Sequence, residues 1–426
     1  MQLLRSEPSF ACRQQPRNDV AGFLFPPLLG WVTQVDYTGA PLLFRIRKAL
    51  RYVGLYGLRR TLVKARGQYH MKRQYATLPA NHVRQNSLAH VGLIGCGNFA
   101  YSVIAYYLRK NCGHVIRGCM DLNIGRAASL FEQYKACYYT TDAKAIIEDP
   151  KIRLVFIASN HASHAEYAIA ALAAGKDVHI EKPHVVNDDQ LDRLCATLQA
   201  SAGRIVSVGF NRPRSPFGNR IRELLWHETG ELMQNWFVAG HEIAGDHWYF
   251  SEAEGGRVLG NLCHWTDLTY QMMPPERRFP IRITPMRSAK SDCDIAVNYL
   301  FGDGSIGIIT FSAKGHAFEG VKERYASHRG NTLISMDDFK RLVADVGTKK
   351  ISESLGHRDH GHEESIVNSF RLAADSTARG LAVAYIWEAA QLFLRTKQAL
   401  ESSAPVILDA WVPNLQSRRN PCAISS

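Results

Sequence analysis

The stretch GLIGCGNFAYSVIAYYL, Gly92 to Leu108, decides the fold expected for this chain of 426 residues. It starts as a short apolar β run, turns at two closely spaced glycines, and continues into an apolar segment with helical spacing. Similar β runs recur farther along, with helical stretches such as Ser163 to Gly175 between most of them. Strands that alternate with helices predict a parallel, doubly wound sheet. The β runs are Ala89–Gly95, His114–Asp121, Arg153–Ser159, Asp177–Ile180 and Arg204–Phe210.

The second half of the chain has a different pattern. DIAVNYLFGDGSIGIITFSA, Asp294 to Ala313, consists of two β runs around Gly-Asp-Gly-Ser, which indicates an antiparallel hairpin. We therefore expect an α/β N-terminal Rossmann domain and an α+β C-terminal domain with a large, mostly antiparallel open sheet. The expected divisions are an N-terminal arm over 1–40, a basic helical extension over 41–87, the Rossmann domain over 88–212, a substrate and oligomerisation domain over 213–410, and a tail over 411–426.

The composition is that of an ordinary soluble protein, with 46% hydrophobic and 21% charged residues. Nine cysteines are scattered without a C-x-x-C pair, which predicts reduced thiols in the cytoplasm rather than a disulfide scaffold or a cysteine zinc site. No apolar run reaches the roughly 18 residues that a membrane-spanning helix needs. The apolar run Ala21 to Val32 contains two prolines, and we do not interpret it as a signal peptide.

The formal net charge of +12 comes from one short segment. Residues 41 to 90 hold eleven basic and no acidic side chains, whereas residues 91 to 426 hold 37 basic and 36 acidic ones. A nearly neutral main body argues against a nucleic-acid partner. Leucines and other apolar residues recur at helical intervals in the basic segment, which predicts one or two amphipathic helices with a bend or break at Gly54 or Gly57. Residues 41 to 75 either contact an anionic membrane surface or acidic partner, or pack against the main body or another subunit.

The glycine turn has the pattern of a dinucleotide site. Gly95, Gly97 and Ala100 form G-x-G-x-x-A between a strand and a helix. The first glycine permits the tight turn, the second lets the backbone approach a pyrophosphate, and the helix N-terminus favours negative charge. The next strand ends at Asp121, whose carboxylate suits the ribose hydroxyls of NAD(H), while Arg126 keeps NADP(H) as the alternative. The competing interpretation is a Rossmann-like domain without a nucleotide. The cofactor contacts expected in the turn also include Asn98 and Phe99.

A longer stretch points to a family. ASNHASHAEYAIAALAAGKDVHIEKP, Ala158 to Pro183, together with the glycine turn, resembles the glucose-fructose oxidoreductase, inositol dehydrogenase and MocA (Gfo/Idh/MocA) family of pyridine-nucleotide oxidoreductases. The resemblance continues through Gly209 to Pro216 and Glu254 to Leu268, and covers roughly residues 89 to 400. It implies a nicotinamide held at the junction of the two domains and a homo-oligomer, either a dimer or a tetramer.

The resemblance also implies roles for individual residues. Hydride transfer from a secondary alcohol needs a group that takes the hydroxyl proton and a cation that stabilises the developing alkoxide. Lys182 of the E-K-P motif can polarise the oxygen, and His264, with an unperturbed pKa of about 6.5, can accept the proton. The implied cofactor contacts are Ser159, Asn160, His164, Glu181 and Lys182. The implied substrate contacts are Arg212, Trp248, Asn261, His264 and Asp267.

One position departs from the family pattern. Many of these dehydrogenases carry an aspartate four residues before the histidine, whereas this chain has Gly260 there, followed by Asn261. Asp267, three residues after His264, is then the nearby acid, and it either orients the helix or contacts the substrate. The departure predicts a different proton relay or a different reaction.

Two histidine-rich stretches carry weaker signals. HEIAGDHWYF, His241 to Phe250, and LGHRDHGHEES, Leu355 to Ser365, lack a recognised ligand spacing, so we expect no metal site. His241, Asp246, His247 and Trp248 are instead expected to line a polar substrate pocket.

The sequence as a whole predicts an NAD(H)-dependent oxidoreductase acting on a hydroxyl of a sugar or cyclitol. The resemblance also implies nucleotide sugars, as in polysaccharide synthesis. The alternatives are an NAD-dependent glycosidase that uses transient oxidation, and a non-catalytic NAD-binding scaffold docked through its basic segment.

Overall fold

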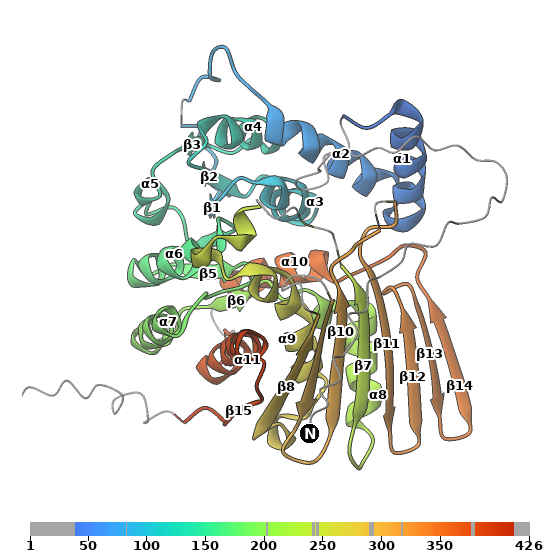
Figure 1. The fold of residues 1–426 in the computed structure, drawn as a ribbon. Coiled ribbons are helices and arrows are strands. Elements are labelled where there is room, and N and C mark those ends of the chain that lie inside the picture. The colour runs from blue at the N-terminus through green and yellow to red at the C-terminus, as the bar shows by residue number, and fades with distance from the viewer. Residues whose placement is uncertain are drawn as a thin grey trace, which may run out of the picture.

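The computed structural model describes residues 39–81, 83–201, 203–240, 243, 247–288, 294–316, 318–375 and 380–412. These residues form two sheets, with helices packed on both (Figure 1). The first sheet has six parallel strands in the order β3-β2-β1-β4-β5-β6. The strands are β1 Val91–Ile94, β2 Ile116–Met120, β3 Tyr138–Thr140, β4 Leu154–Ile157, β5 Asp177–Ile180 and β6 Val206–Val208. This confirms the predicted Rossmann sheet.

Helices connect these strands and cover the sheet. Almost every strand residue is buried, as expected for a parallel sheet covered on both faces. The connecting helices are the π-helix η2 Ala100–Ile104, α3 Ala105–Cys112, α4 Ile124–Tyr134, α5 Lys144–Ile147, α6 His161–Ala173 and α7 Asp188–Ala200. The strand order reverses between β1 and β4, which opens a crevice at their carboxyl ends. The glycine turn follows β1 and the loop 158–160 follows β4, so both border this crevice.

The second sheet has nine strands in the order β14-β13-β12-β11-β7-β10-β9-β8-β15. All neighbouring pairs are antiparallel except β7 with β10. The predicted hairpin is confirmed, since Leu300 pairs with Ile306 across the Gly-Asp-Gly-Ser turn. The strands are β7 Met233–Ala239, β8 Ile281–Arg287, β9 Asp294–Leu300, β10 Ile306–Ser312, β11 Lys322–Arg329, β12 Thr332–Asp337, β13 Arg341–Val346, β14 Lys349–Ser354 and β15 Val406–Leu408.

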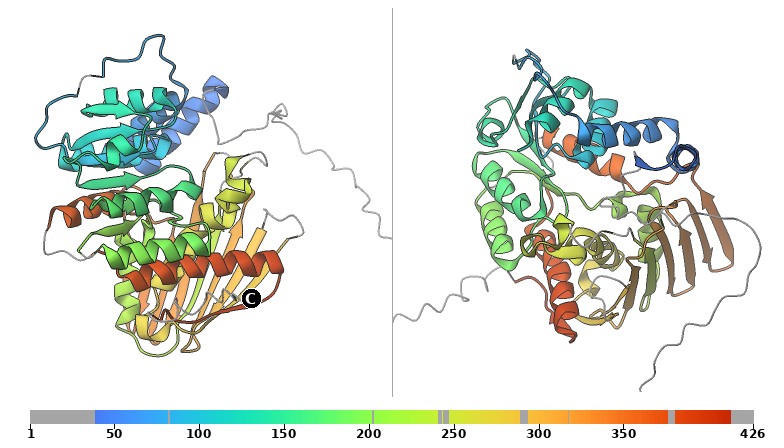
Figure 2. Two further views of the ribbon diagram at one scale, coloured as in Figure 1. Left: turned by 90° about the vertical axis from the view of Figure 1, so that its left-hand side faces the viewer. Right: turned by 45° about the horizontal axis from the view of Figure 1, so that its top comes forward.

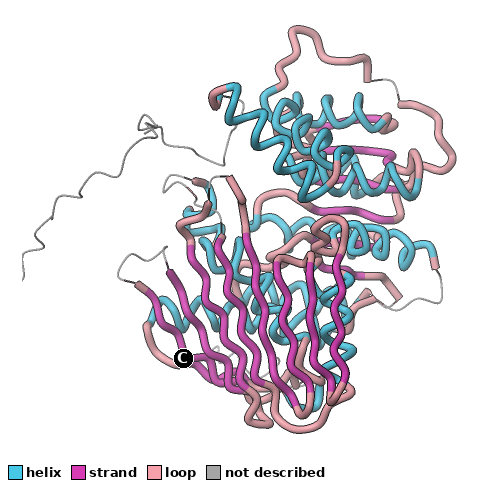
Figure 3. Tube along the Cα trace, turned by 90° about the vertical axis from the view of Figure 1, so that its right-hand side faces the viewer, coloured by secondary structure: helices cyan, strands magenta, loops and turns pink. Residues whose placement is uncertain are grey.

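Helices cover one face of this sheet, and the other face is open (Figure 3). Burial alternates along the strands, which places large apolar side chains such as Trp236 and Tyr325 on the covered face. The helices of this half are α8 Pro216–Trp226, α9 Cys263–Gln271, α10 His362–Ala374 and α11 Val383–Ser402, with the π-helix η6 Val258–Leu262 directly before α9. Short 3₁₀ turns occupy η3 Arg212–Arg214, η4 Trp248–Phe250, η5 Glu252–Glu254 and η7 Pro275–Arg277.

The last two helices tie the two halves together. Helix α11 runs beside α7 (Figure 2), and its Ile386 and Phe393 belong to the same apolar core as strands β4 to β6. Leu392 and Leu400 of the same helix belong to the core of the nine-stranded sheet. Helix α10 packs against α3 of the Rossmann half. Residues between β14 and β15 of the second sheet therefore help to build the core of the first half.

The basic segment forms two helices on the main body. These are α1 Leu42–Tyr56 and α2 Leu58–Lys72, and the chain breaks between them at Gly57, whose φ is 82°. Arg51 of α1 pairs with Glu319 at 2.6 Å, and His70 of α2 lies 2.7 Å from the carbonyl oxygen of Cys96 in the glycine turn. Of the two interpretations of this segment, the structure therefore supports packing against the main body. No helix within the described ranges has both the length and the apolar character needed to cross a membrane.

Candidate active site

The glycine turn has the geometry that a dinucleotide requires. Gly95 has a φ of 90°, and a side chain there would overlap the backbone of Ala158, so only glycine fits. A Cβ at Gly97 would meet no atom within 4 Å, which leaves open space at the point where a pyrophosphate would approach. Ala100 begins the helix that follows, and that helix directs its N-terminus at this space. The turn therefore fits the expected cofactor.

Asp121 lies at the carboxyl end of β2, beside the turn. Its Oδ2 accepts a hydrogen bond from the backbone N–H of Cys96 at 2.8 Å, and its Oδ1 accepts one from Asn123 at 2.8 Å. The carboxylate thus holds the turn and the start of α4 together where a ribose would lie. Phe99 is 37% exposed, whereas Oδ1 of Asn98 is buried without a partner among the described residues.

His164 joins the two loops that border the crevice after β4 and β5. Its Nδ1 lies 2.8 Å from the carbonyl oxygen of Pro183, and its Nε2 lies 3.1 Å from that of Ser159. Burial lowers the pKa of His164, so the ring is neutral and donates to one of the two carbonyls. Asn160 is held by Glu254, whose Oε1 accepts from Nδ2 at 2.6 Å. Both predicted cofactor residues thus fix the shape of the loop through protein contacts.

Glu181 of the E-K-P motif turns away from the crevice. Its Oε1 lies 3.2 Å from Nε2 of His179, and that histidine reaches Ser369 of α10 at 2.8 Å. A side chain at Gly209 would overlap the carboxylate, so glycine provides its space. The structure therefore gives Glu181 contacts that anchor the end of β5.

Lys182 reaches across to the π-helix of the second half. Its Nζ donates a hydrogen bond to the carbonyl oxygen of Gly260 at 2.5 Å. Burial alone would lower the pKa of this amine, but Tyr249, Cys263 and Glu181 together raise it above its usual range. Lys182 therefore remains a cation at neutral pH.

Gly260 stands where the family resemblance led us to look for an aspartate, and the structure explains why no side chain is present. A Cβ at this position would lie 2.6 Å from Cε2 of Tyr249 and 2.9 Å from Cε1 of His161. His161 is itself buried, which with the charge of Lys182 lowers its pKa to about 2. Two aromatic rings thus occupy the space that an aspartate would need.

His264 lies at the start of α9 near Lys182. Its Nδ1 is buried and has no hydrogen-bond partner among the described residues, and the same is true of Oδ1 of Asn261. Burial first, and then the charges of Arg212 and Lys182, hold the pKa of His264 well below 6.5. The unperturbed value of about 6.5 that the sequence suggested therefore does not apply. The ring is a neutral imidazole with an unused nitrogen.

Arg212 forms a buried ion pair that sequence reasoning missed. Its Nε and Nη2 donate to the two carboxylate oxygens of Glu323 at 2.7 and 2.8 Å, and its guanidinium lies 4.5 Å from the ring of Trp265. His360 approaches the same carboxylate at 3.2 Å. Burial would raise the pKa of Glu323, but Arg212 and His360 hold it well below its usual range. The Arg212 guanidinium, which the resemblance assigns to substrate binding, is thus already paired with the carboxylate of Glu323.

The remaining residues predicted to contact the substrate differ in their surroundings. Asp267 faces α11, where its carboxylate accepts hydrogen bonds from Tyr385 at 2.7 Å and Gln271 at 2.8 Å, so a role in fixing α9 suits it better than substrate contact. Trp248 is 43% exposed, and its ring lies 4.8 Å from that of His161. The predicted pocket residues His241 and Asp246 lie outside the described residues.

His360 and His362 of the stretch Leu355 to Ser365 lie next to Arg212. Both are partly buried, burial lowers the pKa of each, and both are among the groups that lower the pKa of His264. Within the described ranges, no group of three or more His, Cys, Asp or Glu side chains is arranged to hold a metal ion. The cluster of histidines in the sequence was the signal that could have placed these residues at the site.

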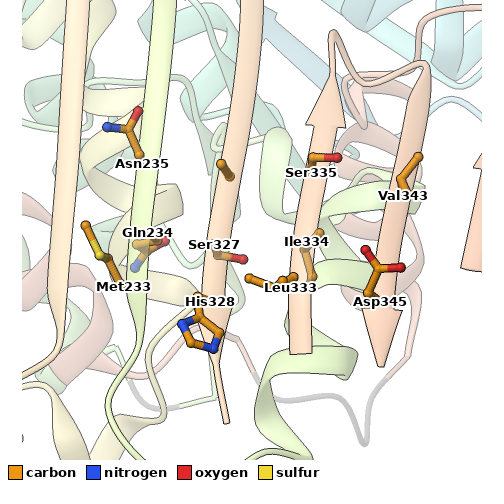
Figure 4. A pocket seen from close by; sticks show the side chains of 11 residues that line it. Met233, Gln234, Asn235, Ser327, His328, Leu333, Ile334, Ser335, Val343 and Asp345 are labelled. Atoms are coloured by element: carbon orange, nitrogen blue, oxygen red, sulfur yellow. The ribbon is translucent and has the colours of Figure 1, made fainter. Parts of the chain in front are cut away.

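A cavity adjoins these residues, and a smaller one lies elsewhere on the second sheet. The larger, of about 1020 Å³, lies between α1–α2, the helix after the glycine turn and the second half of the chain, and Arg212, Tyr249 and His360 line it. A smaller one of about 320 Å³ lies along β7, β11, β12 and β13 (Figure 4). His328 and Asp345 are the titratable side chains in its lining. The larger cavity therefore adjoins the candidate active site.

Sequence comparison connects this geometry with known proteins. Residues 89–210 match the family described as "Oxidoreductase family, NAD-binding Rossmann fold". The uncharacterized oxidoreductase YrbE of Bacillus subtilis is 30% identical over 241 residues, which are 55% of this chain and 69% of that protein. Inositol 2-dehydrogenase of Pseudomonas savastanoi pv. phaseolicola is 32% identical over 124 residues, 29% of this chain and 37% of the enzyme. The match to oxidoreductase P35 of Formosa agariphila (34% identical) covers 32% of this chain and 41% of that protein. The chain thus spans less than half the length of these last two relatives.

Solved structures share the fold. Levoglucosan dehydrogenase in complex with NADH superimposes with a TM-score of 0.65 at 17% identity, covering 76% of this chain and 100% of that one. GenD2 from gentamicin A biosynthesis, in complex with NAD, superimposes with a TM-score of 0.63 at 21% identity, covering 79% and 100%. At these identities the likeness concerns the fold alone.

Proposed function

Because the chain belongs to the Gfo/Idh/MocA family of oxidoreductases with an NAD-binding Rossmann fold, we propose that it is an NAD(H)-dependent dehydrogenase of a sugar or cyclitol. The observation that carries the proposal is the pairing of a cation with a neutral base: Lys182 stays protonated, and the nearby His264 has an unused ring nitrogen. The names of two similar proteins, inositol 2-dehydrogenase and levoglucosan dehydrogenase, indicate substrates of this class for those proteins.

NAD(H), when bound, supplies the nicotinamide that accepts or donates the hydride. The chain's own contribution begins at the glycine turn, where the open space at Gly97 suits the pyrophosphate and Asp121 suits the adenosine ribose. The same carboxylate disfavours an additional phosphate on that ribose, which supports NAD(H) over NADP(H).

Lys182 and His264 have separate roles at the substrate oxygen. The Lys182 ammonium polarises that oxygen and stabilises negative charge on it as the proton leaves. His264 accepts the proton at its ring nitrogen during oxidation and returns it during reduction. Because burial first, and then the charges of Arg212 and Lys182, disfavour imidazolium, His264 holds the proton only weakly. Asn261, whose Oδ1 is also unused, can accept a hydrogen bond from a second hydroxyl of the substrate.

The test is an activity screen with matched lysine variants. The full chain is incubated with NAD⁺ and a panel of inositols and monosaccharides, and NADH fluorescence reports turnover. We expect Lys182→Met to lower kcat by about 10²-fold or more, because it removes the cation that stabilises the alkoxide. Lys144→Met, at an exposed position on α5, is the control and should leave activity unchanged. A Lys182→Met protein that keeps full activity would refute the mechanism.

A further inference from the structure

The larger cavity, which we call the extension cavity, is lined on one side by residues of α1 and α2. Figures 1 and 2 show where these two helices lie on the main body. Its volume of about 1020 Å³ is at the upper end of the range for small-molecule sites. A site of this size offers more room than one sugar ring and a nicotinamide edge require. The charges of the lining residues therefore indicate which further chemical group the substrate carries.

Two cations of α2 line the extension cavity without a carboxylate partner in the described part of the chain. The Nζ of Lys64 lies 4.1 Å from the ring centre of Tyr56 and 5.1 Å from that of Tyr52. Arg60 donates to the carbonyl oxygen of Ser102 at 2.5 Å and lies over two further tyrosine rings. Rings and a carbonyl accept these cations without neutralising them.

The acidic residues of the same lining are mostly used elsewhere. Three of the four form ion pairs with other cations, and the fourth, Asp359, accepts a backbone hydrogen bond from Gly361. The pairs are Arg212 with Glu323 at 2.7 Å, Arg51 with Glu319 at 2.6 Å and Lys110 with Glu363 at 2.7 Å. The side of the cavity formed by α2 thus keeps an excess of positive charge.

The state of Lys64 supports an anionic occupant. Burial first, and then the nearby charges of Arg60, Arg358 and Lys48, lower the pKa of this lysine to about 7. A protonated Lys64 is unfavourable because other cations lie close to it. An anion with two charges would remove that cost and restore the protonated amine.

The extension cavity adjoins the candidate active site. Tyr249 lines the cavity, and its ring also lies against Gly260, the residue whose carbonyl receives Lys182. Arg212 lines the same cavity, and its charge acts on His264. Tyr249 and Arg212 therefore connect the lining of the extension cavity with the residues that handle the proton.

We propose that the extension cavity binds a phosphoryl group carried by the substrate, through Lys64 and Arg60 of α2. This inference rests on the proposed dehydrogenase function and narrows its substrate class to a sugar phosphate or a nucleotide sugar. Phosphate oxygens accept charge-assisted hydrogen bonds from ammonium and guanidinium groups. The tyrosine rings beside the cations suit a flat base, which would distinguish a nucleotide sugar from a simple phosphate.

The experiment measures anion binding by calorimetry on the full chain, with and without saturating NADH. Inorganic pyrophosphate is the first probe. NADH is included because Asn98 and Phe99 of the glycine turn also line the extension cavity, so binding to the NADH-saturated protein separates an anion site from the cofactor site. We expect pyrophosphate to bind the NADH-saturated protein, and Lys64→Gln to weaken this binding by about tenfold. Arg59→Gln, which removes a charge from an exposed position on the same helix, should have no effect. Lys64→Arg should retain binding, which separates loss of charge from loss of folding.

Two results would overturn the proposal. The first is equal binding by the Lys64→Gln and Arg59→Gln variants, and the second is pyrophosphate that binds only in competition with NADH, which would assign the cations to the cofactor. Glucose 1-phosphate and UDP-glucose then distinguish the sources of the phosphoryl group, since only a nucleotide site binds UDP-glucose more tightly than both other probes. If the protein binds pyrophosphate through Lys64 but oxidises no sugar, the result supports the anion site and refutes the proposed dehydrogenase function.

Discussion

The side-chain amine of Lys182 lies 2.5 Å from the carbonyl oxygen of Gly260, so a backbone group receives the lysine where the family resemblance suggested an aspartate. A carbonyl accepts a hydrogen bond but carries no full charge and cannot take up a proton. The proton relay at this site therefore lacks an acid at position 260. His264, four residues farther along the chain, is left as the candidate base. The rings of Tyr249 and His161 fill the space beside Gly260.

We expect Gly260→Asp to destabilise the protein and not to restore an acidic relay. A Cβ at this position would lie 2.6 Å from Tyr249, so a ring must move, and overpacking of this kind costs about 1–3 kcal/mol. Urea unfolding measures the loss. The double variant with Tyr249→Ala should recover part of it, because removal of the ring creates the missing space. Equal or greater destabilisation of the double variant would contradict this explanation.

The activity of the protein should not follow the ordinary titration of a histidine. Burial and the neighbouring cations hold the pKa of His264 well below 6.5, so the ring is already neutral at pH 6. We expect kcat/KM for sugar oxidation to show no rise through pH 6.5 that depends on this residue. His264→Gln should lower kcat by about 10²-fold at every pH tested. A wild-type inflection near pH 6.5 that disappears in His264→Gln would show that His264 titrates normally.

Asp267 makes stability depend on pH. Burial raises the pKa of Asp267 to about 6, whereas an unfolded aspartate has a pKa of about 3.9. The folded protein therefore holds the extra proton between these values, and the contribution of Asp267 to stability is lost as the pH rises through 6. Asp267→Asn is neutral at every pH. Its free energy of unfolding relative to the wild type should improve by about 2 kcal/mol between pH 4 and pH 7.

The control for this prediction is Asp142→Asn, which removes an exposed carboxylate near α5. It reports the general effect of deleting one negative charge. A relative improvement of the same size in both variants would mean that burial of Asp267 is not the cause.

Local patterns were sufficient for most of the fold. The strand Asp177–Ile180 was predicted at its observed bounds, because it is short, β-rich and bordered by a glycine and the E-K-P turn. The sequence analysis does not predict strand β3, Tyr138–Thr140, since a run of three residues is too short to show a periodicity. Its strand character comes from pairing with β2, which the local sequence cannot reveal.

The site was less accessible to sequence reasoning. Motifs identified Lys182 and His264. However, Tyr249 and Cys263, which raise the pKa of Lys182, and Arg212, which lowers that of His264, are distant in the chain from the residue that each affects. Glu323 is 111 residues from Arg212, and no spacing rule links them. The lowered pKa of His264 likewise depends on burial and on cations from separate elements, so a sequence can suggest the residue but not its protonation.

The extension should also influence the cofactor site through a close contact between α2 and the glycine turn. A Cβ at Gly67 would overlap Oδ1 of Asn98, so Gly67→Ala forces that side chain to rotate. Asn98 lies in the turn expected to hold the pyrophosphate. We therefore expect NADH to bind about fivefold more weakly, a loss of about 1 kcal/mol, in a fluorescence titration.

Gly54 provides the matched control, because it lies in α1 and a Cβ there would meet no atom within 4 Å. Gly54→Ala should leave NADH affinity unchanged and stabilise the helix by about 0.5–1 kcal/mol. Equal NADH affinity in the two variants would mean that Asn98 accommodates the methyl group without disturbing the turn. Weaker binding in Gly67→Ala alone would instead establish that the basic extension helps to shape the dinucleotide site, since the substituted residue lies in α2 and the affected ligand binds the Rossmann sheet.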